Sequence, residues 1–303
     1  QYINNLIGIE IMSISASMVK ELRERTGAGM MECKKALVDS NGDLDAAIDL
    51  LRTTGKAKAE KKAKRIAAEG RIVIKSDTKH AVILEINSET DFVANDSNFI
   101  KFAESVAEAI LDNEISDLEC LNKTNLSSGT NIEMARTDLI AKIGENISIR
   151  RFDKIKQCDN MGLYTHGAKI GVVVSLSGGD EEVSKDIAMH VAASNPICID
   201  SEGVPEELVS REKRIFKEQA ASSGKPPEIV EKMIEGRMKK FFKEITLLGQ
   251  SFIKNPDLSV NDLLNESNAE IISFKRYEVG EGIEKKEENF ADEVMAQIKG
   301  SES

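Results

Sequence analysis

The 303-residue sequence has no tryptophan, and aromatic residues make up only 4% of the chain. Its four cysteines, Cys33, Cys120, Cys158 and Cys198, lie far apart and form no Cys-x-x-Cys pair. The three histidines form no His-Glu-x-x-His pattern, so the sequence predicts neither a metal site nor a cofactor. Reduced thiols in a cytoplasmic protein are the simplest interpretation of these scattered cysteines.

No stretch of the sequence approaches the ~18 consecutive apolar residues that a membrane-spanning helix needs. The formal net charge is −11, whereas nucleic-acid binding generally requires a basic surface. We therefore expect a partner that is another protein, and neither a nucleic acid nor a membrane. Residues 1–12 lack a basic segment and a cleavage site, so we expect sequence upstream of a start at Met12, or added expression sequence, rather than a targeting signal.

The stretch at residues 87–96 connects a predicted strand, 81–86, to a predicted helix that begins at Asp96. Apolar residues alternate before this connection and recur at helical spacing after it. The connection itself is polar except for Phe92 and Val93. An aromatic residue on such a loop is typical of a binding anchor. The alternative is that Phe92 folds back onto the local core.

Five short blocks of sequence carry a family resemblance. They are residues 21–31 (ELRERTGAGMM), 90–93 (TDFV), 142–147 (KIGENI), 190–194 (HVAAS) and 278–284 (EVGEGIE). Together they resemble the bacterial translation elongation factor Ts family, in family order from about Ser13 to the C-terminus. The resemblance implies a guanine-nucleotide exchange factor that binds the GDP form of elongation factor Tu during translation elongation. It also implies that the chain is not itself an enzyme.

The resemblance further implies which residues contact the GTPase. Phe92 would wedge between helices of the GTPase domain, and Asp91 would disturb the region that holds Mg²⁺, with Thr90 and Val93 in the same contact. Other implied contacts are Met30, Met31, Lys34, Ile143, Gly144, His166 and Ile253. From the residues alone, Met30 and Met31 are also compatible with a helix core, and His166 with a structural loop position.

The predicted fold class is α+β, with several parts in series. These parts are a three-helix bundle resembling a ubiquitin-associated domain at 13–55, a basic linker helix at 56–69, core lobes at 70–152 and 153–279, and a C-terminal module at 280–303. The two lobes repeat one plan of small antiparallel sheets and a helix. The C-terminal module is expected to contain a helix with Phe290, Val294 and Ile298 on one face.

Residues 206–246 interrupt the second lobe with two helical patterns. The turn signal between them, at 222–227, predicts an antiparallel helical hairpin that projects from the core. This hairpin is also a possible surface for a homodimer.

Two functions from other classes are also compatible with parts of the sequence. Glu89 and Asp91 could form an acid/base pair of an enzyme, although no nucleophile or metal pattern accompanies them. The N-terminal bundle could make the chain a ubiquitin-associated-type adaptor without exchange activity.

The basic residues at 56–65 could contact RNA or an acidic partner, or could form a solvated connecting helix.

Overall fold

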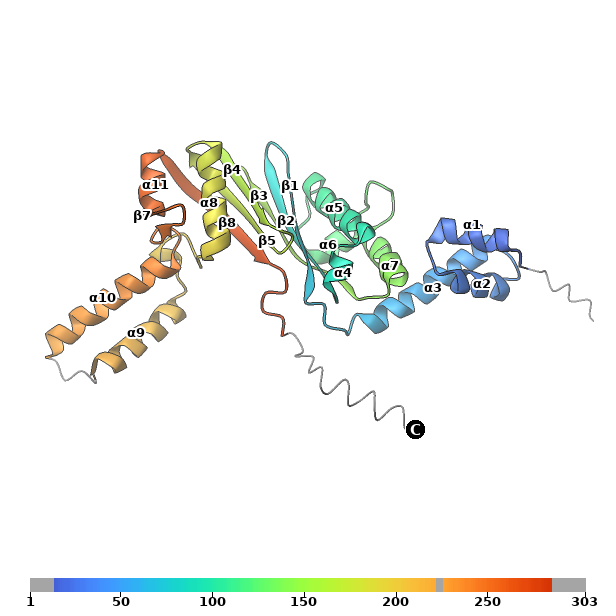
Figure 1. Ribbon diagram of the computed structural model, residues 1–303, viewed down its shortest axis with the longest axis horizontal. Helices are drawn as coiled ribbons and strands as arrows, with labels where there is room; N and C mark the ends of the chain where they lie inside the picture. Colours follow the sequence, from blue (N-terminus) through green and yellow to red (C-terminus); the bar gives the residue numbers. More distant parts are fainter. Residues whose placement is uncertain (1–13, 222–225, 285–303) are drawn as a thin grey trace, which may run out of the picture.

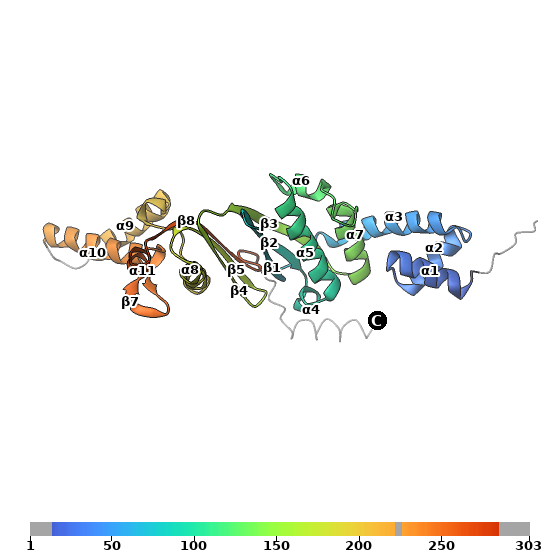
Figure 2. The same cartoon turned by 90° about the horizontal axis from the view of Figure 1, so that it is seen from above.

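The computed structural model describes residues 14–221 and 226–284. Both views show an elongated molecule with a helical bundle at one end, a pair of helices at the other, and two sheets between them (Figures 1 and 2). This arrangement confirms the expected α+β class, with N-terminal helices followed by small antiparallel sheets. The expected C-terminal helix lies outside the described residues.

The N-terminal bundle consists of α1 (Ala16–Thr26), α2 (Met30–Asp39) and the first half of α3 (Leu44–Lys62). Ser15 and Asp43 cap α1 and α3 by accepting hydrogen bonds from backbone N–H groups of the first turn. The bundle has a small core of its own, formed by Val19, Leu22, Cys33, Ala36, Leu37 and Ala47.

Helix α3 differs from the expected layout, because it runs without a break through residue 55 to Lys62. The third helix of the bundle and the separate linker helix expected at 56–69 are therefore one element. Gly55, at the expected boundary, is buried against α7 (Ile132–Ile143), where an added Cβ would lie 3.4 Å from the Cβ of Ala141. This glycine allows close helix packing. The domain boundaries themselves remain predictions.

The first sheet has the strand order β1-β2-β3 and is antiparallel. Its strands are β1 (Glu69–Ser76), β2 (His80–Ser88) and β3 (Ile147–Lys156). The connection between β2 and β3 contains α4 (Asp91–Ala94), α5 (Ser97–Asp112), α6 (Leu118–Lys123) and α7 (Ile132–Ile143). Helix α6 lies in a polar stretch between α5 and α7, and it is held there by its buried residue Leu121.

The second sheet has the order β4-β5-β8 and is also antiparallel. Its strands are β4 (Asn160–His166), β5 (Ile170–Gly178) and β8 (Ala269–Glu278). Between β5 and β8 lie α8 (Glu181–Ser194), the short 3-10 helix η1 (Ser201–Gly203), α9 (Glu206–Ala221), α10 (Pro227–Ile245), β6 (Ser251–Phe252), β7 (Asn255–Ser259) and α11 (Val260–Glu266). The central strand of each sheet has an irregularity in its pairing with the last strand, after Glu85 in β2 and after Ser175 in β5.

The two sheets pack against each other, with α5 and α7 on the outer face of one and α8 on the outer face of the other (Figure 1). Their shared core contains Ile72, Ala81, Ile83, Ile155, Val173 and Tyr277. The approach is close at Gly171, where an added Cβ would lie 2.4 Å from the side chain of Ile72. Polar contacts cross the same interface, since Tyr277 Oη donates to Asp153 Oδ2 at 2.7 Å.

Helices α9 and α10 form the hairpin that projects away from the sheets (Figures 1 and 2). Its internal core consists of Ala220, Ile234 and Met238, with partly buried Val209, Phe216, Val230, Phe241 and Phe242 packed against it. The apolar faces of the two helices therefore cover each other. Part of the connection, residues 222–225, lies outside the described residues.

Candidate functional site

Helix α4 is the element that presents the TDFV segment. Thr90 is its N-cap, and the Thr90 hydroxyl accepts a hydrogen bond of 3.4 Å from the backbone N–H of Val93. A helix of four residues is not stable by itself, since helix nucleation is unfavourable. Val93 and Ala94 fix its inner face, because both side chains are buried in the core of the first sheet. Arg71 on β1 holds its far end by donating to the carbonyl of Ala94 at 3.1 Å.

The side chain of Phe92 lies on the opposite face of α4 and is 84% exposed. The interpretation that Phe92 folds back onto the local core is therefore wrong. Beside it is a shallow, open hollow that is lined by Glu69, Glu89, Thr90, Asp91, Phe92 and Lys169. Lys169 forms an ion pair with Glu69 across this hollow. The turn between β4 and β5, which contains Lys169, thus contributes to the same surface as α4.

The turn that follows α7 is hydrogen-bonded to the loop before α4. Both donors of Thr90 bond to the carboxylate of Glu145, the hydroxyl at 2.7 Å and the backbone N–H at 3.0 Å. The next residue, Asn146, donates its backbone N–H to Glu89 at 2.6 Å and its side-chain amide to the carbonyl of Arg65 at 2.7 Å. Two residues of one turn therefore hold two successive residues of the loop.

Two of the implied contact residues, Ile143 and Gly144, lie in this same region. Gly144 ends α7 in the left-handed conformation, with φ at 91°, and its N–H donates to the carbonyl of Ile140. That conformation favours glycine, which has no Cβ to oppose it. Ile143 is half-buried and packs against the core of the first sheet. The structure thus brings 90–93 and 143–144 together, although about 50 residues separate them along the chain.

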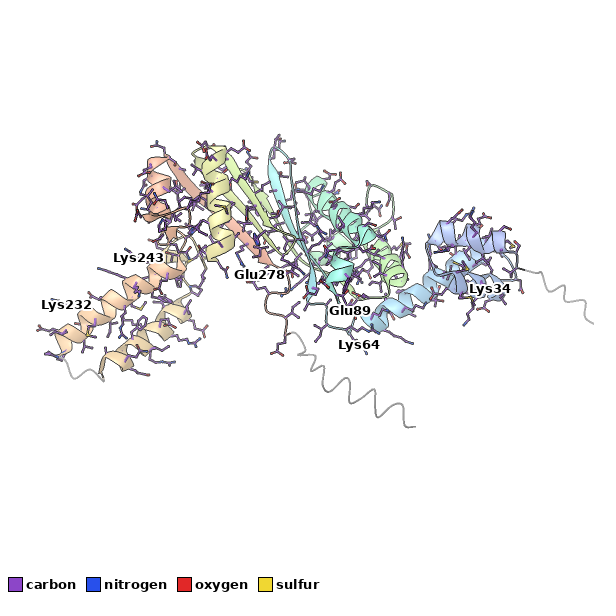
Figure 3. All side chains as sticks on the ribbon, in the orientation of Figure 1. Lys34, Lys64, Glu89, Lys232, Lys243 and Glu278 are labelled. Carbon is purple, nitrogen blue, oxygen red and sulfur yellow. The ribbon has the colours of Figure 1, made fainter. Side chains whose placement is uncertain are left out.

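Glu89 and Asp91 do not have the environment of an acid/base pair. Glu89 accepts from Asn146 and forms an ion pair of 3.4 Å with Arg65. Figure 3 labels Glu89 and also Lys64, which lies just past the end of α3. Asp91 is exposed in the first turn of α4. The partners of Glu89 are structural, and the hollow beside the two carboxylates is wide open rather than an enclosed reaction site.

The remaining implied contacts lie on other parts of the molecule. His166 is exposed at the end of β4, with its Nδ1 3.4 Å from the hydroxyl of Tyr164. Ile253 is 46% exposed in the turn between β6 and β7. Met30 and Met31 are 59% and 72% exposed on α2, so the core interpretation of these two residues is wrong. Lys34 is exposed on the same helix, at the end of the molecule away from the hairpin (Figure 3).

His190, from the 190–194 block, holds the turn that carries Ile253. The ring is fully buried, and its Nδ1 accepts a hydrogen bond of 3.2 Å from the backbone N–H of Ile253. Nε2 then carries the proton and donates to Gln250 at 3.0 Å. Burial lowers the pKa of His190, and the bond to Gln250 raises the pKa by a smaller amount. The neutral ring is therefore the form that supports the turn.

Residue-by-residue reasoning from the sequence missed Glu145 and His190, which hold contact loops from a distance. A usable signal existed, because each lies within one of the five blocks, at 142–147 and 190–194. Within residues 14–221 and 226–284, no group of three or more His, Cys, Asp and Glu side chains could hold a metal ion. Among the described helices, none is long and apolar enough to span a bilayer.

The chain is similar to known proteins of one family. A family model described as elongation factor TS matches residues 89–281, which include α4, the 142–147 turn and His190. The chain is 56% identical over 294 residues to elongation factor Ts of Thioalkalivibrio sulfidiphilus, covering 96% of this chain and 100% of that protein. It is 57% identical over 290 residues to elongation factor Ts of Legionella pneumophila strain Paris, covering 95% of this chain and 99% of that protein.

Proposed function

Since the chain belongs to the elongation factor Ts family, and is thus a nucleotide exchange factor for elongation factor Tu rather than an enzyme, we propose that it releases GDP through α4. Phe92 inserts between helices of the GTPase domain, and Asp91 disturbs the region that holds Mg²⁺. The single observation behind this proposal is the exposure of Phe92, at 84%, on a loop that is fixed from three sides. Aromatic side chains that are rigidly presented in this way dominate the binding energy of many interfaces.

The physical basis of such exchange is thermodynamic linkage. If the exchange factor and GDP each weaken the binding of the other to the GTPase, they do so by the same factor. Free energy gained at the interface is thereby used to displace the metal and loosen the phosphate-binding loop. The chain needs no cofactor for this, and none of its side chains has to touch the nucleotide.

The other contact residues supply affinity in this proposal. Met30, Met31 and Lys34 form an exposed patch on α2, and methionines suit a pliable protein-binding surface. Gly144 and Ile143 lie beside α4, while His166 and Ile253 extend the interface over the second sheet. Thr90 and Val93 support α4, since Thr90 caps it and Val93 is buried beneath it.

Finer features of the layout belong to the same proposal. The bundle at 13–55 acts as a ubiquitin-associated-like binding module, and the two lobes at 70–152 and 153–279 are similar units. The proposed boundary between the two lobes, at residue 152, falls inside strand β3. One continuous strand therefore connects the two lobes. The protein acts in the cytoplasm, where bacterial translation takes place, and the α9–α10 hairpin remains a possible homodimer surface.

A nucleotide-release assay tests the proposal. Elongation factor Tu is loaded with fluorescent GDP, and the release rate is measured against the concentration of this protein, with excess unlabelled GDP present. Exchange predicts a release rate that rises to a plateau, and Asp91→Ala should lower that plateau less than Phe92→Ala. A binding adaptor predicts complex formation with no acceleration at any concentration. That alternative also leaves unexplained the family match, which covers 89–281 rather than the N-terminal bundle.

A further inference from the structure

The carboxylate of Glu145 receives both hydrogen-bond donors of one residue, Thr90. Thr90 is the residue at which the chain leaves β2 and enters α4. Its hydroxyl also accepts from Val93, so the position of this hydroxyl sets the first turn of α4. Bonds to an ionised group are stronger than bonds between neutral groups, and a two-point contact fixes direction as well as distance. Glu145 therefore determines the orientation of Thr90.

We propose that Glu145 is a positioning residue for nucleotide exchange, holding α4 so that Phe92 points toward the partner before the partner arrives. The inference rests on the proposed role of Phe92 and adds a residue that acts through it. Its physical reason is preorganisation, since a four-residue helix without this bond would populate several conformations, and ordering it on binding would oppose association.

The backbone around Glu145 supports this role. Gly144 turns the chain in the left-handed conformation directly before Glu145, which directs the carboxylate to α4. Lys62, at the end of α3, donates to the carbonyl of Gly144. The turn is thus attached on one side to the helix of the N-terminal bundle and on the other side to α4. Two surfaces that contact the partner are held by one turn.

The first test compares Glu145→Ala, Glu145→Gln and a control, Glu108→Ala, which removes an exposed carboxylate from α5 of the same lobe. Loss of two charge-assisted bonds should reduce the plateau rate of GDP release by about tenfold or more in Glu145→Ala. The concentration at half-plateau should change less, by no more than about threefold, because the distant contacts remain. Glutamine can still accept from the Thr90 N–H and donate to its hydroxyl, so Glu145→Gln should recover most of the rate. Glu108→Ala should behave as the unaltered protein.

Hydrogen exchange supplies a readout that is independent of activity. Amides of residues 91–95 should exchange at least about tenfold faster in Glu145→Ala, while amides of the β1-β2-β3 sheet remain protected. A plateau rate within twofold of the unaltered protein, or unchanged exchange at 91–95, would overturn the proposal. If Glu145→Ala does not fold, Glu145→Thr, which keeps a polar group but cannot reach both donors, replaces it under the same criteria.

A double variant separates this inference from the proposed function. If Glu145 acts through Phe92, adding Glu145→Ala to Phe92→Ala should change the release rate by less than about twofold, because the group being positioned is already absent. Fully additive effects would show that Glu145 acts elsewhere and would overturn the inference alone. A normal release rate in Phe92→Ala itself would instead contradict the proposed function.

Discussion

The backbone N–H of Gly280 donates a hydrogen bond of 2.8 Å to the buried carboxylate of Glu85, 195 residues earlier in the chain. Arg150 and Arg151 also bond to this carboxylate, at 2.9 Å and 2.7 Å. Burial raises the pKa of Glu85, but the hydrogen bonds from Gly280 and the two arginines together outweigh it and lower the pKa overall. The 278–284 block therefore attaches the two sheets to each other.

Replacing Glu85 with alanine should destabilise the protein by about 3 kcal/mol, because it leaves two partly buried arginines and a buried N–H without their acceptor. The measurement is the free energy of unfolding in urea at pH 7. Glu119→Ala is the matched control, since Glu119 pairs with Lys123 on an exposed helix face and should contribute less than about 0.5 kcal/mol. Equal stabilities of the two variants would contradict the assigned role of Glu85.

The buried His190 should make the turn of Ile253 sensitive to acid. Its pKa lies below the ordinary value of 6.5, so the unfolded chain takes up the proton first as the pH falls. Stability is therefore retained above about pH 6.5 and is lost progressively below it. Thermal unfolding measured between pH 7 and pH 5 should show this loss, and His190→Gln should flatten the slope. An identical slope in the two proteins would exclude His190 as its source.

The hairpin should be removable without loss of the core. Its apolar faces cover each other, and its attachment includes the bond from the Ile197 N–H to the carbonyl of Ile245. Deleting residues 207–244 with a short Gly/Ser bridge should leave a cooperatively folded protein that still accelerates GDP release. The check is a thermal unfolding curve together with the release assay. Complete unfolding would show that the hairpin belongs to the core.

The exposed methionines of α2 should contribute affinity. Changing Met30 and Met31 together to alanine removes two side chains that are 59% and 72% exposed, so the unfolding temperature should hardly change. The concentration needed for half-plateau release should rise by about threefold or more, with the plateau itself preserved. Val38→Ala, at another exposed apolar position of α2, is the control. A lower plateau at saturation would place these residues in the release step.

The sequence was most informative where local patterns decide the structure. Alternating apolar residues predicted β2, and apolar residues at helical spacing after Asp96 predicted α5. It was misleading at the expected division between 55 and 56, because α3 continues there and Gly55 packs against Ala141 of a distant helix. A contact of this kind has no signature in the neighbouring residues.

The candidate site could be predicted only in part for the same reason. Phe92 was identifiable as a rare aromatic residue on a polar loop, and the resemblance named its neighbours. The bonds from Thr90 to Glu145 and from Ile253 to His190 join residues 55 and 63 positions apart. Sequence spacing cannot indicate such pairs, because the fold alone brings them within hydrogen-bond distance.

The most direct test of the exchange mechanism is Phe92→Ala, with its unfolding temperature and its GDP release rate measured on the same preparation. The side chain is 84% exposed, so its removal should leave the unfolding temperature nearly unchanged. As a buried anchor in the complex it should contribute ~2 kcal/mol or more, which corresponds to a loss of about 30-fold in the release rate. Truncation of a phenylalanine in the core would instead cost about 3–5 kcal/mol of stability. A variant that unfolds many degrees lower, yet exchanges normally once folded, would contradict the wedge mechanism.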